Sequence, residues 1–138
     1  KEDRVLFYNP EGTGAVGRSL RPVRAKWWSY GDLSTGIPIG TGKHAILVED
    51  VASACSVSNV IGFVGIALLG TNITKSIAKT LSKYERITLV LDNDASLKAI
   101  SLSRKLNIQC YVRFTKLDLK YLDTGKIREV INNDKQTI

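Results

Sequence analysis

The sequence predicts an α/β protein: a parallel sheet flanked by helices and preceded by a small antiparallel β-hairpin subdomain. From residue 45 onward, apolar strand-like runs alternate with helix-like segments, an order typical of parallel sheets with right-handed crossovers. Before residue 43, short apolar and aromatic runs are separated by turn residues, as in antiparallel hairpins. The chain has 138 residues, of which 43% are hydrophobic and 24% are charged, a composition that fits one soluble domain with a modest core.

Residues 1–42 are expected to form a basic, β-rich unit. Residues 5–8 and 15–20 are predicted to be the two strands of a hairpin that closes through a glycine-containing turn. Residues 26–30 are predicted to add a third strand. Residues 31–42 are rich in Gly, Ser, Thr and Pro, so we expect them to connect this unit to a second one.

Residues 43–138 are expected to form the α/β unit. Its clearest strand is 87–91, and its clearest helix is 74–84, where Ile77 and Leu81 fall on one face. Strands are predicted at 45–48, 66–69, 87–91 and 109–114, and helices at 50–58, 74–84, 95–106 and 125–132. In a sheet of this kind, functional groups gather at the carboxyl ends of the strands.

The charge balance favours a polyanionic partner. Because 20 Lys and Arg residues outnumber 13 Asp and Glu residues, the formal net charge is +7. Nucleic acid is the partner that such a balance favours.

Several absences narrow the class of protein. The longest apolar stretch, residues 60–69, is too short to span a bilayer, so no membrane partner is expected. No signal peptide is visible, so a cytoplasmic location is expected, and the lack of methionine suggests a processed protein or a fragment. Cys55, Cys110 and His44 are too few for a four-ligand zinc site; we expect the cysteines in the core and His44 on the surface.

Three carboxylates follow predicted strands. Glu49 comes directly after the first strand of the α/β unit, and Asp92 and Asp94 come after the third. Carboxylates gathered at one sheet edge repel one another unless a cation neutralises them, and oxygen-only ligation suits Mg²⁺ or Mn²⁺. Such a site supports phosphoryl or phosphodiester chemistry. The alternative is that these residues, with Asp50, only cap the helices that follow.

Basic and aromatic residues are concentrated in the first unit. They are Arg18, Arg21, Arg24 and Lys26, followed at once by Trp27 and Trp28. Basic side chains of this kind track a single-stranded backbone while an aromatic ring stacks on a base. Neighbouring strand residues point to opposite faces, so only one tryptophan, taken as Trp28, joins the basic face and the other is expected in the core. The alternative is a solvated hairpin with a core tryptophan.

Two lysines are candidates for nucleotide binding. Residues 40–44 have some features of a phosphate-binding loop, but the glycine spacing is wrong and His44 replaces the Ser or Thr that binds Mg²⁺. Lys43 is nevertheless placed where it could reach a triphosphate. Lys98 lies about one helical turn beyond Asp94, where it could meet a phosphate; the alternative for both lysines is a solvated position.

An ordered set of motifs resembles the Toprim domain, a Rossmann-like, metal-dependent module of DNA primases, type IA and type II topoisomerases and some nucleases. The motifs are AILVED with Glu49, GIALLGTN around Gly70, and LVLDNDASLKA with Asp92, Asp94 and Lys98. This resemblance implies a Toprim sheet over residues 43–138, with Glu49, Asp92 and Asp94 as catalytic metal ligands.

Two further segments resemble bacterial and phage-type primases and primase-helicases within that superfamily. The segment RVLFYNPEGTGAVGRSLRPVRAKWWSY is similar to the stretch ahead of their Toprim domain, with Arg18 and Lys26 at its basic positions. DLKYL, at residues 118–122, resembles their Asp-Pro-Lys-Asp-Leu element and implies that Asp118 is a further metal ligand.

The sequence also departs from the family pattern. Asp50 replaces the glycine after the motif glutamate, and Ser96 replaces the glycine after the paired aspartates. Glycine allows backbone conformations that these residues adopt less easily. Leu119 and Tyr121 replace Pro and Asp in the last element, which removes one potential metal contact.

The resemblance implies a DNA primase catalytic core: a nucleotidyltransferase of the DNA-directed RNA polymerase type that makes short RNA primers for DNA replication with Mg²⁺ or Mn²⁺. The implied partners are a single-stranded DNA template, ribonucleoside triphosphates, and a helicase or zinc-binding domain in cis or in trans. The location would be the host cytoplasm if the protein is phage-encoded. The alternatives are a non-catalytic single-stranded DNA-binding Toprim module and a Toprim nuclease.

Overall fold

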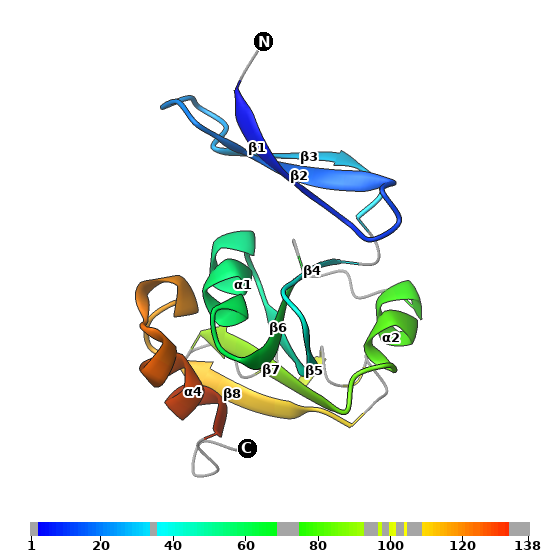
Figure 1. Cartoon of the computed structure of the whole chain (residues 1–138), viewed down its shortest axis with the longest axis vertical. Coiled ribbons are helices and arrows are strands. Elements are labelled where there is room, and N and C mark those ends of the chain that lie inside the picture. The colour runs from blue at the N-terminus through cyan, green and yellow to red at the C-terminus, as the bar shows by residue number, and fades with distance from the viewer. Residues whose placement is uncertain are drawn as a thin grey trace.

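The computed structural model describes residues 3–33, 36–68, 75–92, 97, 100, 101, 104 and 109–132. These residues form a three-stranded sheet and a five-stranded sheet, which lie one above the other in Figure 1. No helix in these ranges is long and apolar enough to cross a membrane.

The three-stranded sheet is antiparallel, in the order β1-β2-β3. Its strands are β1 (Arg4–Tyr8), β2 (Gly14–Ser19) and β3 (Trp27–Gly31), each within one residue of its predicted range. Asn9 closes the β1–β2 hairpin: its Oδ1 accepts hydrogen bonds from the backbone N–H groups of Thr13 (2.9 Å) and Gly14 (3.1 Å). The first predicted hairpin and its third strand are therefore confirmed.

The five-stranded sheet has the order β4-β6-β5-β7-β8, and every neighbouring pair is parallel except β4 with β6. Its strands are β4 (Ile37–Ile39), β5 (Gly42–Val48), β6 (Gly62–Ala67), β7 (Arg86–Asp92) and β8 (Tyr111–Thr115). The predicted α/β class with a parallel sheet behind a small antiparallel sheet is confirmed.

Two expectations about the strands were wrong. The predicted connection over residues 31–42 contains the edge strand β4, which has only three residues and a central proline. The strand predicted at 66–69 is β6, which begins at Gly62 and ends at Ala67. The whole run 60–69 is apolar, so no change of periodicity marks where the strand starts.

Helices cover both faces of the five-stranded sheet. They are α1 (Val51–Ser58), α2 (Lys75–Leu81), the 3₁₀ helix η1 (Leu119–Tyr121) and α4 (Thr124–Asn132). Helices α1 and α4 lie on one face and α2 lies on the other (Figure 1). Helix α2 corresponds to the helix predicted at 74–84 and ends at Leu81, three residues earlier than expected. Most of the helix predicted at 95–106 lies outside the described residues, and the four described positions in it are helical.

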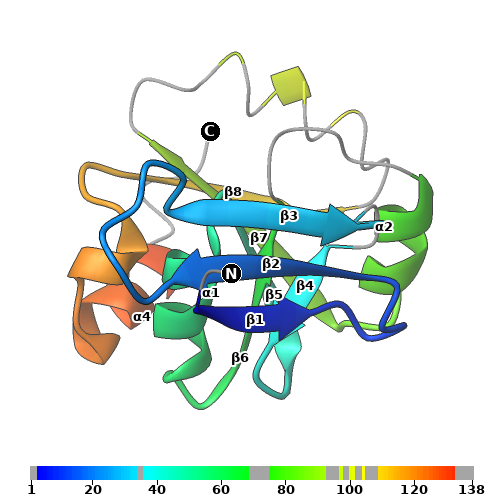
Figure 2. The ribbon, with the colours of Figure 1, turned by 90° about the horizontal axis from the view of Figure 1, so that it is seen from above.

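The two sheets share a hydrophobic core. Val16 of β2 is 3% exposed and belongs to the same cluster as Ile37 of β4, Ile46 of β5 and the buried face of α1. Phe7 and Leu33 pack against this cluster from the first sheet and from the segment that leaves it. Seen from above in Figure 2, the three-stranded sheet lies over the five-stranded one. This packing fixes the position of the smaller sheet on the larger.

Candidate functional site

A small cavity lies at the carboxyl ends of β5, β7 and β8. Its volume is about 20 Å³, which is enough for one water-sized occupant. Its lining residues are Val48, Glu49, Asp50, Ser53, Val90, Leu91, Thr115, Asp118 and Leu119. The fold thus brings Glu49 and Asp118, which are far apart in the sequence, to the same cavity. This is the edge where the sequence predicted a metal site.

Asp50 is the N-cap of α1. Its Oδ1 accepts a hydrogen bond from the backbone N–H of Ser53 (2.8 Å), and its Oδ2 accepts one from the Ser53 hydroxyl (3.2 Å). The capping interpretation is therefore confirmed for Asp50. Its φ of −129° and ψ of 159° are extended values that any residue adopts, so glycine is not required at this position.

Asp118 lines the cavity from its position just before η1. It precedes that short helix, but its side chain makes no hydrogen bond that caps it. Next to it, the Lys120 ammonium lies 3.5 Å from Asp118 Oδ2 and 3.9 Å from Asp50 Oδ2. The Asp50 carboxylate, more than any other group, raises the pKa of Lys120. Buried Leu119 anchors the helix in the core beneath these polar residues.

The remaining predicted carboxylates lie on or after β7. Asp92 is the last residue of that strand, and its backbone is opposite Thr115, which lines the cavity. The backbone of Asp92 therefore reaches the same edge as Glu49 and Asp118. The Asp92 side chain, Asp94 and Lys98 lie outside the described part of the structure.

The donor chemistry at this edge fits a hard divalent cation. The two described candidate ligands, Glu49 and Asp118, offer carboxylate oxygens only, which Mg²⁺ and Mn²⁺ prefer. Among the residues that the structure describes, no group of three or more His, Cys, Asp or Glu side chains is arranged to hold a metal ion. A complete site would need the carboxylates of the 92–94 segment as well.

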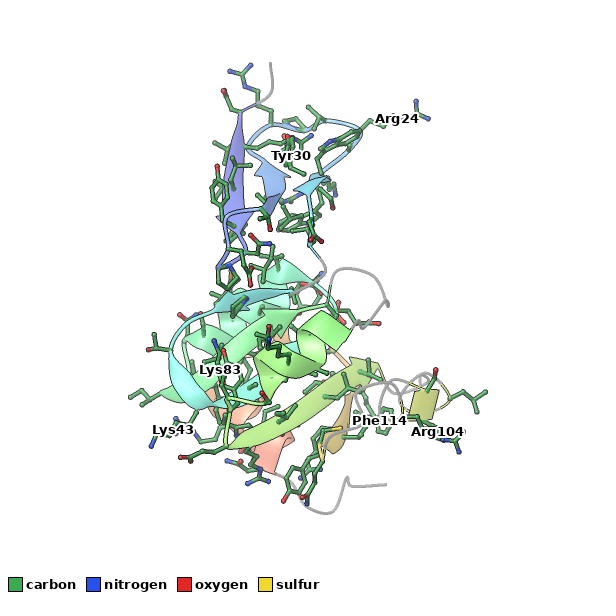
Figure 3. All side chains as sticks on the ribbon, turned by 90° about the vertical axis from the view of Figure 1, so that its right-hand side faces the viewer. Arg24, Tyr30, Lys43, Lys83, Arg104 and Phe114 are labelled. Atoms are coloured by element: carbon green, nitrogen blue, oxygen red, sulfur yellow. The ribbon has the colours of Figure 1, made fainter. Side chains whose placement is uncertain are left out.

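Lys43 is not brought to this cavity. It lies at the amino end of β5, six residues before Glu49, which corresponds to roughly 20 Å along an extended strand. Its ammonium lies 3.3 Å from Glu85 Oε1, and both side chains are exposed. Figure 3 shows Lys43 and Phe114, near the end of β8, at opposite ends of the five-stranded sheet.

The basic residues of the first unit lie on and around the three-stranded sheet. Arg18 is half-buried, with its guanidinium 5.5 Å from the centre of the Trp27 ring. Arg21 makes an exposed ion pair with Asp3 at 3.0 Å. Arg24 and Lys26 are exposed in the connection between β2 and β3, and Arg24 points away from the body of the molecule in Figure 3.

The two tryptophans differ from the expectation. Arg18 is paired with Trp27 across β2 and β3, whereas Trp28 is paired with Gly17, so Trp28 lies on the opposite face from Arg18. Trp27 is 37% exposed and Trp28 is 55% exposed. The expected core tryptophan was therefore wrong, because the small sheet leaves room for both rings at its surface.

Sequence reasoning missed an exposed aromatic face. By strand alternation, Tyr8, Trp28 and Tyr30 share the face of the three-stranded sheet that carries Gly17, and all three are more than 40% exposed. The signal was the period-two spacing of Trp28 and Tyr30 in β3, together with Tyr8 at the end of β1. Each strand alone was too short to show that this face is open.

Sequence reasoning also missed the environment of His44. Its Nε2 lies 2.7 Å from the hydroxyl of buried Thr88, and its ring meets Phe63 edge-on at 4.9 Å. Burial, with smaller effects from Arg86 and Arg113, lowers its pKa to about 4. The expectation of a surface histidine was therefore wrong, because Phe63 of β6 and Thr88 of β7 pack against the ring and leave it half-buried.

An antiparallel three-stranded sheet followed by a five-stranded α/β sheet is a fold similar to that of solved DnaG primase catalytic cores, which contain a Toprim domain. No protein-family model and no curated protein matches the chain. The likeness is to solved structures.

Three solved structures illustrate the likeness. A DnaG primase catalytic domain bound to single-stranded DNA has a TM-score of 0.75 and 16% identity, covering 98% of this chain and 52% of that one. The zinc-binding and RNA polymerase domains of Aquifex aeolicus primase have a TM-score of 0.69 and 21% identity; the match covers 95% of this chain and 40% of that one. The RNA polymerase domain of Mycobacterium tuberculosis DnaG, in complex with double-stranded DNA, has a TM-score of 0.66 and 16% identity; the match covers 94% of this chain and 53% of that one. The chain therefore spans about half the length of these structures.

Proposed function

We propose that this chain is the catalytic core of a DNA primase, which makes short RNA primers on single-stranded DNA in a metal-dependent reaction. The observation that carries the proposal is the meeting of Glu49 and Asp118 in one cavity at the carboxyl edge of a primase-like sheet. The backbone of Asp92 reaches the same edge. Carboxylates at such an edge are the ligands that phosphoryl-transfer chemistry requires.

Each candidate residue has a role in this proposal. Glu49, Asp92, Asp94 and Asp118 would hold Mg²⁺ or Mn²⁺. When bound, this ion would neutralise phosphate oxygens and lower the pKa of the attacking primer hydroxyl. Glu49, which lines the cavity, would also accept the proton from that hydroxyl. Lys98 would contact the phosphates of the incoming ribonucleotide. The distance of Lys43 from the cavity leaves it outside this set.

The three-stranded sheet would bind the template. Arg18, Arg21, Arg24 and Lys26 would contact its phosphates, and Trp28 would stack on a base. Trp28 and Arg18 lie on opposite faces of the sheet. In this arrangement the DNA template would pass around an edge of the sheet. One of its bases would stack on Trp28 on one face, and its phosphates would contact basic residues at the β2–β3 connection. A helicase or a zinc-binding domain would act with this core; one of the similar structures includes a zinc-binding domain.

The test is primer synthesis by the purified chain. Labelled ribonucleoside triphosphates, single-stranded DNA and Mg²⁺ or Mn²⁺ would be supplied to the wild type, Glu49→Gln, Asp92→Ala and Asp118→Asn. We expect oligoribonucleotides from the wild type and a loss of at least 100-fold in each variant. Glu85→Gln is the matched control, because Glu85 is an exposed carboxylate at the opposite end of the sheet. Equal activity in Glu49→Gln and Glu85→Gln would refute the proposed site.

A second candidate function is a single-stranded DNA-binding module without catalysis. It is favoured by Leu119 and Tyr121, which replace Pro and Asp in the last motif and so remove one potential metal contact. This module would give no primer and would bind DNA equally in the wild type and in Asp92→Ala. The same assay run with labelled DNA also tests the nuclease alternative, since a nuclease would shorten the labelled strand.

A further inference from the structure

A cation lies beside this cavity, next to two of the carboxylates that line it. The three carboxylates that line it, Glu49, Asp50 and Asp118, come from the start of α1 and the start of η1. The Lys120 ammonium lies between two of them, 3.9 Å from Asp50 Oδ2 and 3.5 Å from Asp118 Oδ2. Opposite charges at these distances attract one another, and like charges at one edge repel.

Local structure holds Lys120 in this place. Leu119, its neighbour in η1, is 2% exposed and packs in the core with α1, so the backbone of η1 is anchored next to the start of α1. The side chain of Lys120 is about one-third exposed, which is low for a lysine on a short surface helix. The position of the ammonium is therefore set by the fold of the site.

Asp50 increases the repulsion between the carboxylates at the cavity, and a nearby cation offsets this repulsion. Its two carboxylate oxygens accept two hydrogen bonds from Ser53, which hold the carboxylate at the cavity. It adds a negative charge next to Glu49 at the same cavity. Fixing an additional carboxylate at this edge raises the repulsion that the protein must offset when no metal ion is bound.

We propose that Lys120 is a built-in counter-ion of the cavity: it offsets the repulsion between the carboxylates in the metal-free protein and weakens the binding of a divalent cation there. This inference rests on the proposed function, because it concerns the same metal site. Lys120 acts through Asp50 and Asp118, so it is a positioning residue.

The decisive measurement is Mn²⁺ binding by isothermal titration calorimetry. Lys120→Met keeps most of the side-chain length and removes the charge. We expect it to bind Mn²⁺ about three- to tenfold more tightly than the wild type, as one positive charge is removed a few ångströms from the ion in a partly exposed site. Lys120→Arg should bind like the wild type. Lys126→Met, an exposed lysine of α4 outside the cavity, is the matched control. Unchanged or weaker binding by Lys120→Met would overturn the inference.

A second measurement separates this inference from the proposed function. Without metal and at low ionic strength, Lys120→Met should melt about 1–4 °C below the wild type, and high salt should remove the difference by screening the carboxylates. Lys126→Met should show no such salt-dependent loss. If the wild type binds no Mn²⁺, the proposed function fails, while the melting curves still decide the counter-ion role. An unchanged low-salt melting temperature in Lys120→Met would refute that role whether or not metal binds.

Discussion

The two sheets of this molecule differ in how much of their surface is covered. In the five-stranded sheet, residues 45–48 of β5 are at most 3% exposed, because neighbouring strands and helices enclose them. In the three-stranded sheet every residue of β3 is exposed, and Trp28 and Tyr30 keep about half of their surface open to solvent. A strand enclosed on both faces is held by apolar packing, whereas an open strand presents its side chains to a partner. We therefore expect stability to depend mainly on the five-stranded sheet and the proposed DNA binding on the three-stranded one.

The largest expected effect is on stability. Leu89 of β7 is fully buried, and Leu6 of β1 is 42% exposed. Leu89→Ala should lower the free energy of unfolding by about 3 kcal/mol, because it removes buried methyl groups and leaves a cavity. Leu6→Ala should cost less than about 1 kcal/mol. Denaturant unfolding measures both, and equal losses would contradict the division between the sheets.

A smaller effect is expected on DNA binding. Trp28→Ala should weaken the binding of a single-stranded oligonucleotide by about 1–3 kcal/mol, because a stacked base loses its aromatic partner. Trp28→Phe should retain most of the affinity. Fluorescence anisotropy with a labelled oligonucleotide measures both variants. An unchanged affinity in Trp28→Ala would show that the open aromatic face does not stack bases.

The response to acid tests the enclosed sheet. The pKa of His44 falls to about 4 in the folded protein, below its ordinary value of 6.5, so the unfolded chain takes up the proton more readily. The stability that neutral His44 provides is therefore complete above pH 6.5 and is lost as the pH falls towards 4. We expect a loss of about 1–2 kcal/mol, reduced by solvent screening at this half-buried site.

Thermal unfolding at pH 7 and pH 4.5 measures this loss in the wild type and in His44→Gln. Carboxylates also titrate over this range, so the informative quantity is the difference between the two proteins. An identical pH response would mean that His44 takes up its proton at its ordinary pKa.

The smallest effect concerns a single phosphate contact. Arg24→Ala should weaken single-stranded DNA binding by about 1 kcal/mol or less, and it should lower the slope of log K against log salt by about 0.7. Lys43→Ala is the control, because Lys43 lies on the other sheet and pairs with Glu85. Equal slopes in the wild type and Arg24→Ala would show that Arg24 does not contact a phosphate of the template.

The enclosed parts of the fold were the easiest to predict from the sequence. Residues 87–91 are Ile, Leu and Val apart from buried Thr88, because both faces of β7 are covered, and this pattern is visible without any tertiary information. Strand β4 was missed because three residues around Pro38 carry no periodicity, and its pairing with β6 is non-local. Trp27 was misplaced because alternation gives the face of a residue but not what covers that face.

The candidate site was predictable only in part. Glu49 was located from its position after an apolar strand, and Asp118 from the resemblance to primases. Lys120 was not recognised, because its partner Asp50 is distant in the sequence and the contact depends on how η1 packs on α1. The separation of roughly 20 Å between Lys43 and Glu49 arises because Lys43 begins the extended strand β5, and its glycine-rich surroundings do not reveal that strand.

Strand β4 has a consequence for association between molecules. It forms one outer edge of the five-stranded sheet, where unpaired backbone groups would otherwise offer a template for a strand of another chain. Pro38, at its centre, has no backbone N–H, so an incoming strand would lose a hydrogen bond in the middle of a three-residue pairing. The same short element that joins the two sheets thereby protects this edge against aggregation.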